Sequence, residues 1–245
     1  MVGITSTTLR NYSVEEVVQI AVMGGAEVIE WGSDVHIKTL EDAVLAAKLC
    51  AEESIKINSY ATYYRVGSNN RAEWRKICLI AERLGAVSIR TWLGTKGSTD
   101  TSDEEYEAIL EDARFMADAA KEYGLIISNE CHPNTYNDTT ESALRFLTDV
   151  KKDNIKTYYQ SWYCDEAGDK EKLLKTFPRI LDYHVSFSEL VKFQGETNID
   201  RNYINKIAAW LAELDFNGCI LLEFTENGTA DEAVNDLRRL KEIFC

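Results

Sequence analysis

Short apolar segments typical of β-strands alternate with longer amphipathic segments along the whole chain, and this alternation constrains the fold more than any other feature. The pattern predicts eight strands, each followed by a helix, at about 30 residues per unit. Eight such units in 245 residues fit a closed (β/α)8 barrel, the TIM barrel, which typically needs about 250 residues. We therefore predict an α/β fold in which residues 1–245 form one barrel domain.

Capping residues and apolar runs give the expected boundaries. Helices are expected where Ser, Thr or Asn stands three positions before Glu, as in Ser13 and Glu16, and several end at glycine, as at Gly85. Strands are expected at 2–5, 27–31, 55–60, 87–92, from 125, and at 155–161, 181–186 and 219–224. Helices are expected at 13–24, 39–54, 70–85, 102–124, 140–152, 169–177, 200–214 and from 229.

A doubly wound open sheet is the main alternative, because strand–helix alternation serves both folds. That fold predicts a glycine-rich phosphate-binding turn after the first strand. Residues 5–10 read TSTTLR and contain no glycine. No linker or low-complexity tract is visible, and the chain has only two prolines, so nothing marks a domain boundary.

The charge balance excludes some partners. The chain has 27 basic and 41 acidic residues, a net charge of -14, and an acidic surface repels a phosphate backbone, so we expect no nucleic-acid partner. A small anionic substrate could still bind beside Arg90 or Lys192. No apolar run reaches membrane-spanning length, and the N-terminus resembles a strand rather than a signal peptide. Six scattered cysteines without a CxxC pair indicate a reducing compartment, so we expect a cytoplasmic protein with no membrane partner.

Unusual polar residues fall at the predicted strand ends. In a (β/α)8 barrel the loops at the C-terminal ends of the strands converge over the barrel mouth, where the chemistry takes place. All three histidines of the chain lie at or just after such ends. The candidate site residues are Glu30, His36, Arg90, Trp92, Glu130, His132, Gln160, His184 and Glu223.

Two of these carboxylates suggest chemistry by their context. Glu130 and His132 are two residues apart after an apolar run, so an extended backbone presents both on one face, as suits a divalent metal or acid–base catalysis. The alternative is a solvated loop. Glu223 follows an apolar run, and a buried carboxylate needs a cation or a proton. Arg90 could supply that charge instead of a metal, and His36 could be a packed, hydrogen-bonded histidine.

Three motifs carry a family resemblance: IEWGSDVH at 29–36, IRTWLG at 89–94 and ECHPNTYNDT at 130–139. Over essentially its whole length the chain resembles the xylose isomerase-like TIM-barrel superfamily, in its sugar phosphate isomerase/epimerase branch. The resemblance implies one divalent metal held by Glu, Asp, His and Glu at the ends of strands five to eight.

Carried over to this sequence, three of the four implied ligands match: Glu130, His184 and Glu223. Gln160 stands where the family has Asp, and Asp165 is an alternative ligand if the strand runs on. An amide oxygen binds hard cations, but the lost charge should weaken metal affinity. The mostly oxygen ligand set favours Mn2+ or Mg2+, with Co2+ or Zn2+ as alternatives.

The resemblance further implies a sugar or sugar phosphate isomerase/epimerase that acts through an enediolate, with Glu130 and Glu223 as base and acid. Glu30, His36, Arg90, Trp92, His132 and Lys192 would then bind the small-molecule carbohydrate substrate. An inosose-type dehydratase and a non-catalytic sugar-binding barrel remain alternatives, whereas a nuclease is disfavoured by the few histidines and the acidic surface. Residues 187–198 could form a lid or an oligomer contact, for example in a homodimer.

Overall fold

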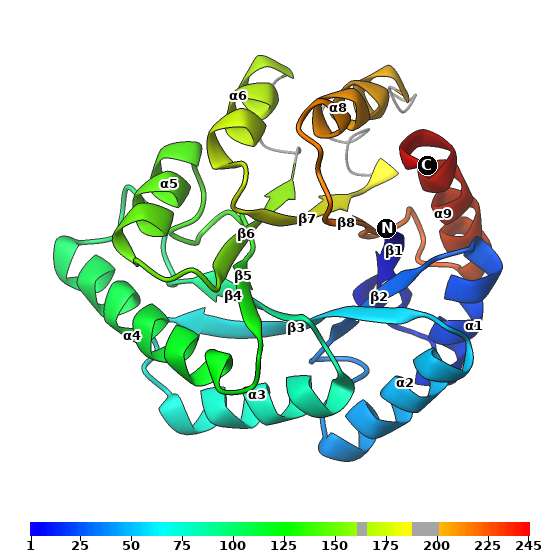
Figure 1. The fold of residues 1–245 in the computed structure, drawn as a ribbon, viewed down its shortest axis with the longest axis horizontal. Helices are drawn as coiled ribbons and strands as arrows, with labels where there is room; N and C mark the ends of the chain where they lie inside the picture. The colour runs from blue at the N-terminus through cyan, green and yellow to red at the C-terminus, as the bar shows by residue number, and fades with distance from the viewer. Residues whose placement is uncertain (161–165, 188–200) are drawn as a thin grey trace.

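Eight parallel strands close into a barrel in the order β1 to β8, and β8 pairs with β1. The computed structural model describes residues 1–160, 166–187 and 201–245. Figure 1 shows the strands around a central axis with helices outside them. The strands are β1 Val2–Thr5, β2 Val28–Gly32, β3 Lys56–Val66, β4 Ser88–Leu93, β5 Ile126–Asn129, β6 Ile155–Gln160, β7 Ile180–Val185 and β8 Cys219–Leu222. The predicted (β/α)8 barrel is confirmed.

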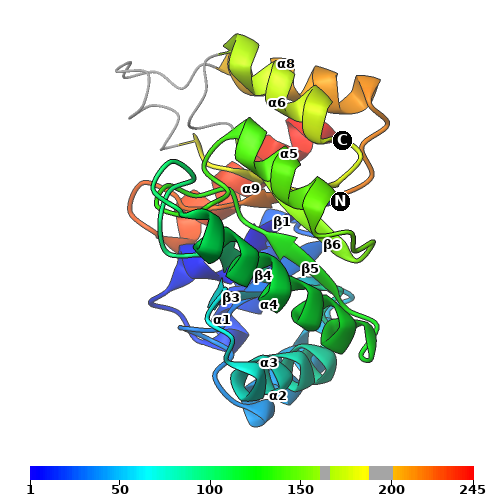
Figure 2. The same cartoon turned by 90° about the vertical axis from the view of Figure 1, so that its left-hand side faces the viewer.

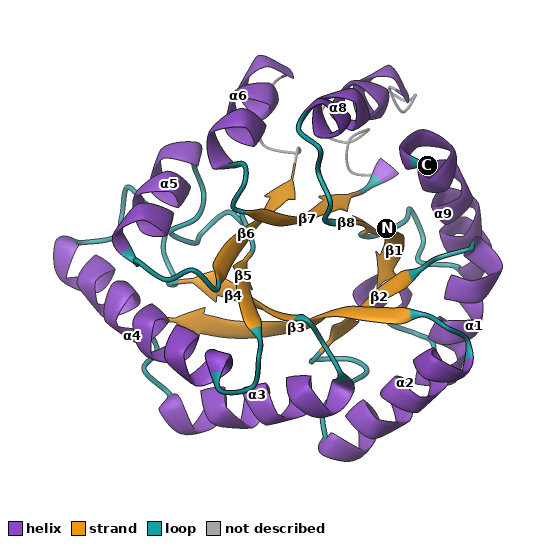
Figure 3. Ribbon diagram, in the orientation of Figure 1, coloured by secondary structure: helices purple, strands orange, loops and turns teal. Residues whose placement is uncertain are grey.

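The helices form the outer layer of the barrel, as the colouring in Figure 3 makes clear. Figure 2 shows α2 and α3 at one end of the molecule and α6 and α8 at the other. The helices are η1 Ser6–Leu9, a 3-10 turn, and α1 Val14–Gly24, α2 Leu40–Glu52, α3 Arg71–Leu84, α4 Asp103–Lys121, α5 Thr140–Asp149, α6 Glu166–Thr176, α8 Arg201–Glu213 and α9 Ala230–Phe244. None of these helices is long and apolar enough to cross a membrane.

Local capping explains where many of the helices begin and end. Ser13 caps α1 by accepting from the backbone N–H of Glu16, while the Glu16 side chain accepts from the backbone N–H of Ser13. Similar reciprocal pairs start α2, α4 and α9. Gly85 follows α3 with φ +76°, a left-handed conformation that residues with a side chain rarely adopt. These signals lie within a few residues of each other, so the sequence reveals them.

Three strand boundaries differ from the prediction and matter for the site, namely the ends of β3, β5 and β8; β8 ends at Leu222 rather than at residue 224. β3 continues to Val66 rather than ending near residue 60, after a register shift between Ala61 and Arg65 against β4. The continued pairing places Arg65 beside Trp92 of β4. β5 ends at Asn129, so Glu130 and His132 follow the strand instead of belonging to it.

The strand register brings the polar residues at the C-terminal strand ends to one rim of the barrel. Gln160 pairs with His184 in the β6–β7 ladder, and His184 pairs with Leu221 in the β7–β8 ladder. Glu223 follows β8 and donates its backbone N–H to the Val185 carbonyl, which ties it to the end of β7. Side chains from four neighbouring strands therefore meet at one end of a rigid, closed sheet.

Candidate active site

Arg90 lies at the centre of three carboxylates at this rim. Its Nε is 3.3 Å from Glu130 Oε2, and its Nη1 is 3.5 Å from both Glu30 Oε1 and Glu223 Oε1. All four side chains are at least nine-tenths buried. Buried carboxylates need compensating charge, and Arg90 provides part of it. The sequence left open whether Arg90, instead of a metal, offsets the charge of Glu223. The structure contains that Arg90–Glu223 ion pair.

Glu130, His184 and Glu223 form a triad with the geometry of a metal site. Ligand atoms of the three residues all lie within 4.8 Å of one another, and all three side chains are buried. His184 Nδ1 is 3.3 Å from Glu223 Oε2 and 3.9 Å from Glu130 Oε1. These three residues are also the predicted ligands that match the family pattern, and the fold brings them together from β5, β7 and β8.

Gln160 sits where the atoms of this triad converge. Its Nε2 is 3.0 Å from Glu130 Oε1, 3.3 Å from His184 Nδ1 and 3.4 Å from Glu223 Oε2. Its Oε1 is buried without a hydrogen-bond partner. An amide exchanges the positions of its oxygen and nitrogen by a half-turn about its last bond. Gln160 is therefore close enough to the triad to complete a set of four ligands.

The charges in this cluster shift the protonation of its members. Burial alone would raise the pKa of Glu30, but the charges of His184 and Arg90 lower it to about 2. Burial likewise opposes ionisation of Glu223, whose pKa is nevertheless lowered by His184 and Arg90. For His184, burial lowers the pKa, yet Glu223 and Glu30 outweigh burial and raise it to about 10. Without a metal, His184 is thus a cation paired with carboxylates.

The donor set fits a hard or borderline divalent cation. Two carboxylates, one imidazole and one amide oxygen are ligands that Mn2+ and Mg2+ accept. The unpartnered oxygen of Gln160 is a buried acceptor of the kind that such a cation satisfies. A divalent charge could also replace the proton of His184 as the partner of Glu130 and Glu223. Glu130, Gln160, His184 and Glu223 are the residues that would hold the metal.

An aromatic wall borders the triad on the β4 side. Trp92 donates its indole N–H to Glu130 Oε2 at 2.5 Å, and its ring stacks on His132 with centroids 4.3 Å apart. Tyr63 packs edge-on against Trp92, and the Arg65 guanidinium lies 4.1 Å from the centroid of the Trp92 ring. Glu130 and His132 thus both contact Trp92, although they lie beyond the end of β5.

One predicted residue, His36, lies outside this cluster, and two further predicted residues fall on segments that the structure does not describe. Both ring nitrogens of His36 are 3.0 Å from groups of the chain, Nδ1 from Ser6 Oγ and Nε2 from the Tyr12 carbonyl. The His36 ring also packs edge-on against Trp31, which is how a structural histidine is held. Lys192 and the alternative ligand Asp165 lie outside the described residues, as does most of the segment 187–198.

Sequence reasoning missed two residues of the site. Tyr158 donates its O–H to Glu30 Oε2 at 2.5 Å, and its ring lies 4.4 Å from that of His184. Tyr158 stands two positions before Gln160 in the same strand, so the two-residue period of a strand could have placed both inside the barrel. Arg65 was missed because the third strand was expected to end before it.

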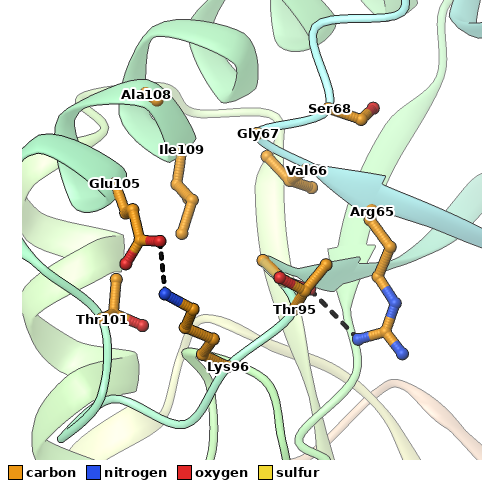
Figure 4. Close-up of a pocket in the computed structure, with 11 residues that line it drawn as sticks. Arg65, Val66, Gly67, Ser68, Thr95, Lys96, Thr101, Glu105, Ala108 and Ile109 are labelled. Atoms are coloured by element: carbon orange, nitrogen blue, oxygen red, sulfur yellow. Dashed lines mark hydrogen bonds and ion pairs between the residues drawn. The ribbon is translucent and has the colours of Figure 1, made fainter.

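Arg65 lies at the edge of a cavity of about 210 Å³ beside the aromatic wall (Figure 4). Its Nη1 donates to the Gly94 carbonyl at 3.1 Å. Across the cavity, Lys96 points toward Glu105, and the two form an ion pair of 2.6 Å. Within the described ranges no carboxylate lies within 4.0 Å of the Arg65 guanidinium. Burial lowers the pKa of Arg65, and the charge of Glu130 opposes that shift.

A family profile described as "Xylose isomerase-like TIM barrel" matches residues 18–243 of the chain. The chain belongs to the xylose isomerase-like TIM-barrel family. The resemblance inferred from the three motifs is therefore confirmed. The strand-end location of the triad is also the location at which TIM barrels place their chemistry.

A dehydratase is similar to this chain over part of its length. A 3-dehydroshikimate dehydratase of Bacillus anthracis is 25% identical over 185 residues, 70% of this chain and 65% of that protein, so the match spans slightly less than two thirds of the relative's length.

Two solved structures share the fold over nearly the full length of the chain. The probable 3-DHS dehydratase of Bacillus anthracis has a TM-score of 0.78 and 19% identity, with 97% of each chain covered. D-allulose 3-epimerase from Methylomonas sp. has a TM-score of 0.80 and 18% identity, with 98% of this chain and 96% of that one covered. At these identities the structural likeness establishes the barrel alone. The named relatives are enzymes of two kinds, epimerases and dehydratases.

Proposed function

We propose that the protein is a divalent-metal-dependent isomerase or epimerase that moves a proton next to the carbonyl of a small sugar or sugar phosphate. The observation that carries this proposal is the pair of buried carboxylates, Glu130 and Glu223, on either side of His184 and Gln160. They directly follow β5 and β8, which have two strands between them, so a substrate over the triad would have a carboxylate on each side.

The side chains of the site have separate tasks in this proposal. Glu130, as a carboxylate, removes the proton from the carbon next to the carbonyl, and Glu223, after taking up a proton from water, delivers it to the resulting enediolate. Exchange with water then removes the proton from Glu130 and protonates Glu223 again. Arg90 pairs with both carboxylates and orients them, while Trp92 holds Glu130 in place through its indole N–H. A bound divalent ion would polarise the carbonyl and stabilise the negative charge that develops on its oxygen. His132, fixed against Trp92, would bind a substrate hydroxyl.

Dehydration of an anionic hydroxy-ketone is the second candidate function. Both reactions begin with the same proton removal. In dehydration, the enediolate then loses a neighbouring hydroxyl group, which leaves as water, instead of taking up a proton at carbon. The observation that favours it is Arg65, a guanidinium at the rim without a carboxylate partner among the described residues, which would pair with a substrate carboxylate or phosphate. A named relative of the family is a dehydratase whose substrate, 3-dehydroshikimate, carries a carboxylate.

The test compares products from three substrate classes after addition of Mn2+ to chelator-treated protein. Neutral ketoses, ketose phosphates and cyclic keto-acids are incubated separately, and mass spectrometry separates isomerisation at constant mass from loss of water. Glu130→Gln and Glu223→Gln should each abolish turnover. Glu226→Gln is the matched control, because Glu226 is an exposed glutamate three residues beyond Glu223. Full activity in both site variants would rule out the two-carboxylate scheme.

A further inference from the structure

The two ring nitrogens of His184 face different groups. Nδ1 faces the candidate metal site, 3.3 Å from Glu223 Oε2 and 3.3 Å from the amide nitrogen of Gln160. Nε2 points the other way and lies 3.4 Å from Glu30 Oε1. The imidazole is therefore held between the ligand atoms on one side and the Glu30 carboxylate on the other.

Glu30 is placed to act on His184 rather than on a substrate. Its side chain has no exposed surface, because it lies inside the barrel. Oε2 accepts the Tyr158 hydroxyl at 2.5 Å, and that hydroxyl is also 3.1 Å from Ser59 Oγ. The Tyr158 ring in turn packs against His184. The hydrogen bond from Tyr158 thus holds the Glu30 carboxylate beside Nε2 of His184.

A metal-binding imidazole is neutral, with a lone pair on one nitrogen and the proton on the other. A carboxylate beside one nitrogen keeps the proton there, fixes the ring orientation and strengthens the opposite nitrogen as a ligand. In this chain the carboxylate lies beside Nε2, which has no hydrogen-bond partner in the described structure.

We propose that Glu30 is a positioning residue that retains the proton of His184 on Nε2, so that His184 binds the divalent metal through Nδ1. This inference rests on the proposed function, because it needs the metal. The sequence predicted that Glu30 contacts the substrate. In this proposal Glu30 instead acts on His184 and does not touch the substrate. Tyr158 belongs to the same arrangement, since its hydroxyl sets the position of Glu30.

Nitrogen NMR of the metal-loaded protein tests the tautomer directly. The chain has three histidines, so 15N-histidine labelling gives three ring systems, and His184→Asn identifies the one that belongs to His184. With diamagnetic Zn2+ as the probe, we expect a proton on Nε2 of His184 and metal coordination at Nδ1. Coordination at Nε2, or no coordination of His184 by bound Zn2+, would overturn the inference while leaving a metal-dependent enzyme intact.

Calorimetric Mn2+ titration tests the role of Glu30. Glu30→Gln should weaken binding by about 10- to 100-fold, the usual effect of removing a carboxylate behind a histidine ligand. Asp182→Asn is the matched control: Asp182 is a buried carboxylate inside the same barrel that bonds Asn58 and the Cys219 backbone N–H. The control should bind Mn2+ like the wild type, and an equal loss in both variants would contradict a specific role for Glu30.

Tyr158→Phe provides a second variant if Glu30→Gln does not fold. It keeps the ring against His184 and removes only the hydroxyl that holds Glu30, so we expect a smaller loss of Mn2+ affinity in the same direction. Unchanged affinity in every folded variant would overturn the inference. Absence of any divalent binding by the wild type would overturn both the inference and the metal-dependent function, which distinguishes that outcome from the others.

Discussion

The indole N–H of Trp92 donates to Glu130 Oε2 at 2.5 Å, and the same tryptophan ring stacks on His132. The proposed base is thereby fixed by a side chain from the neighbouring strand. Trp92→Phe keeps the aromatic contact but removes the donor. Since a hydrogen bond to a charged group contributes about 1.5–3 kcal/mol, we expect kcat to fall by about tenfold or more. Steady-state kinetics measures the effect, and an unchanged kcat would contradict this role of Trp92.

Gln160→Asp restores a third negative charge to the proposed ligand set. The variant should bind Mn2+ more tightly, because cation affinity rises with the number of charged ligands. It should also lower the melting temperature of the metal-free protein, because it adds a carboxylate next to Glu130 and Glu223. Calorimetry and thermal melts with and without Mn2+ give both quantities. Weaker Mn2+ binding by a folded Gln160→Asp protein would exclude residue 160 from the ligand set.

Arg90→Met removes the guanidinium shared by Glu30, Glu130 and Glu223. Loss of one partner of a buried ion pair typically costs about 3–5 kcal/mol, because the remaining charges stay buried and unpaired. We expect a decrease of that size in the free energy of unfolding, measured by urea denaturation without metal. Arg75→Met, at an exposed pair with Glu122, serves as the control and should change stability little.

The ionisation of His184 determines how stability and Mn2+ affinity change with pH. Its pKa rises from the ordinary value of 6.5 to about 10 in the folded, metal-free protein, where Glu223 and Glu30 outweigh the effect of burial. Its contribution to stability is thus fully present below pH 6.5 and is lost as the pH rises through 10. A metal that binds His184 must displace this proton, so Mn2+ affinity should increase by about tenfold per pH unit within that window. Titrations at several pH values check the slope, and a flat dependence would contradict the involvement of His184.

Arg65→Gln tests whether the substrate is anionic. The change removes the charge beside Trp92 and should raise KM for a substrate bearing a carboxylate or phosphate, with a smaller effect on kcat. Neutral ketoses should be unaffected. Kinetics with matched charged and neutral substrates separates carboxylate, phosphate and neutral specificity. Equal KM changes for charged and neutral substrates would show that Arg65 does not recognise an anion.

The barrel could be predicted because its signals are local and repeated. Capping pairs such as Ser13 with Glu16, glycines such as Gly85 and apolar runs at regular spacing lie close together in sequence. Eight parallel strands in a closed barrel have their C-terminal ends at one rim, so residues at these ends can be assigned to one site before any contact between them is known. The triad of Glu130, His184 and Glu223 comes together in the structure for that reason.

Contacts between distant segments could not be predicted in the same way. His36 bonds Ser6 and Tyr12, which lie 30 and 24 residues away in sequence, and nothing near His36 indicates those partners. Glu30 contacts Tyr158 across the barrel interior, 128 residues away. Arg65 depends on β3 continuing through a register shift, which results from pairing with β4 rather than from a local propensity.

The pairing of β8 with β1 determines when the site can form during synthesis. The sheet closes only after residues 219–222 leave the ribosome, because these residues join the last strand to the first. Glu30, Arg90 and Glu130 emerge much earlier, and the second proposed catalytic carboxylate, Glu223, comes just after β8. A nascent chain therefore carries an incomplete set of charged groups until Glu223 is translated, and ring closure and assembly of the site coincide.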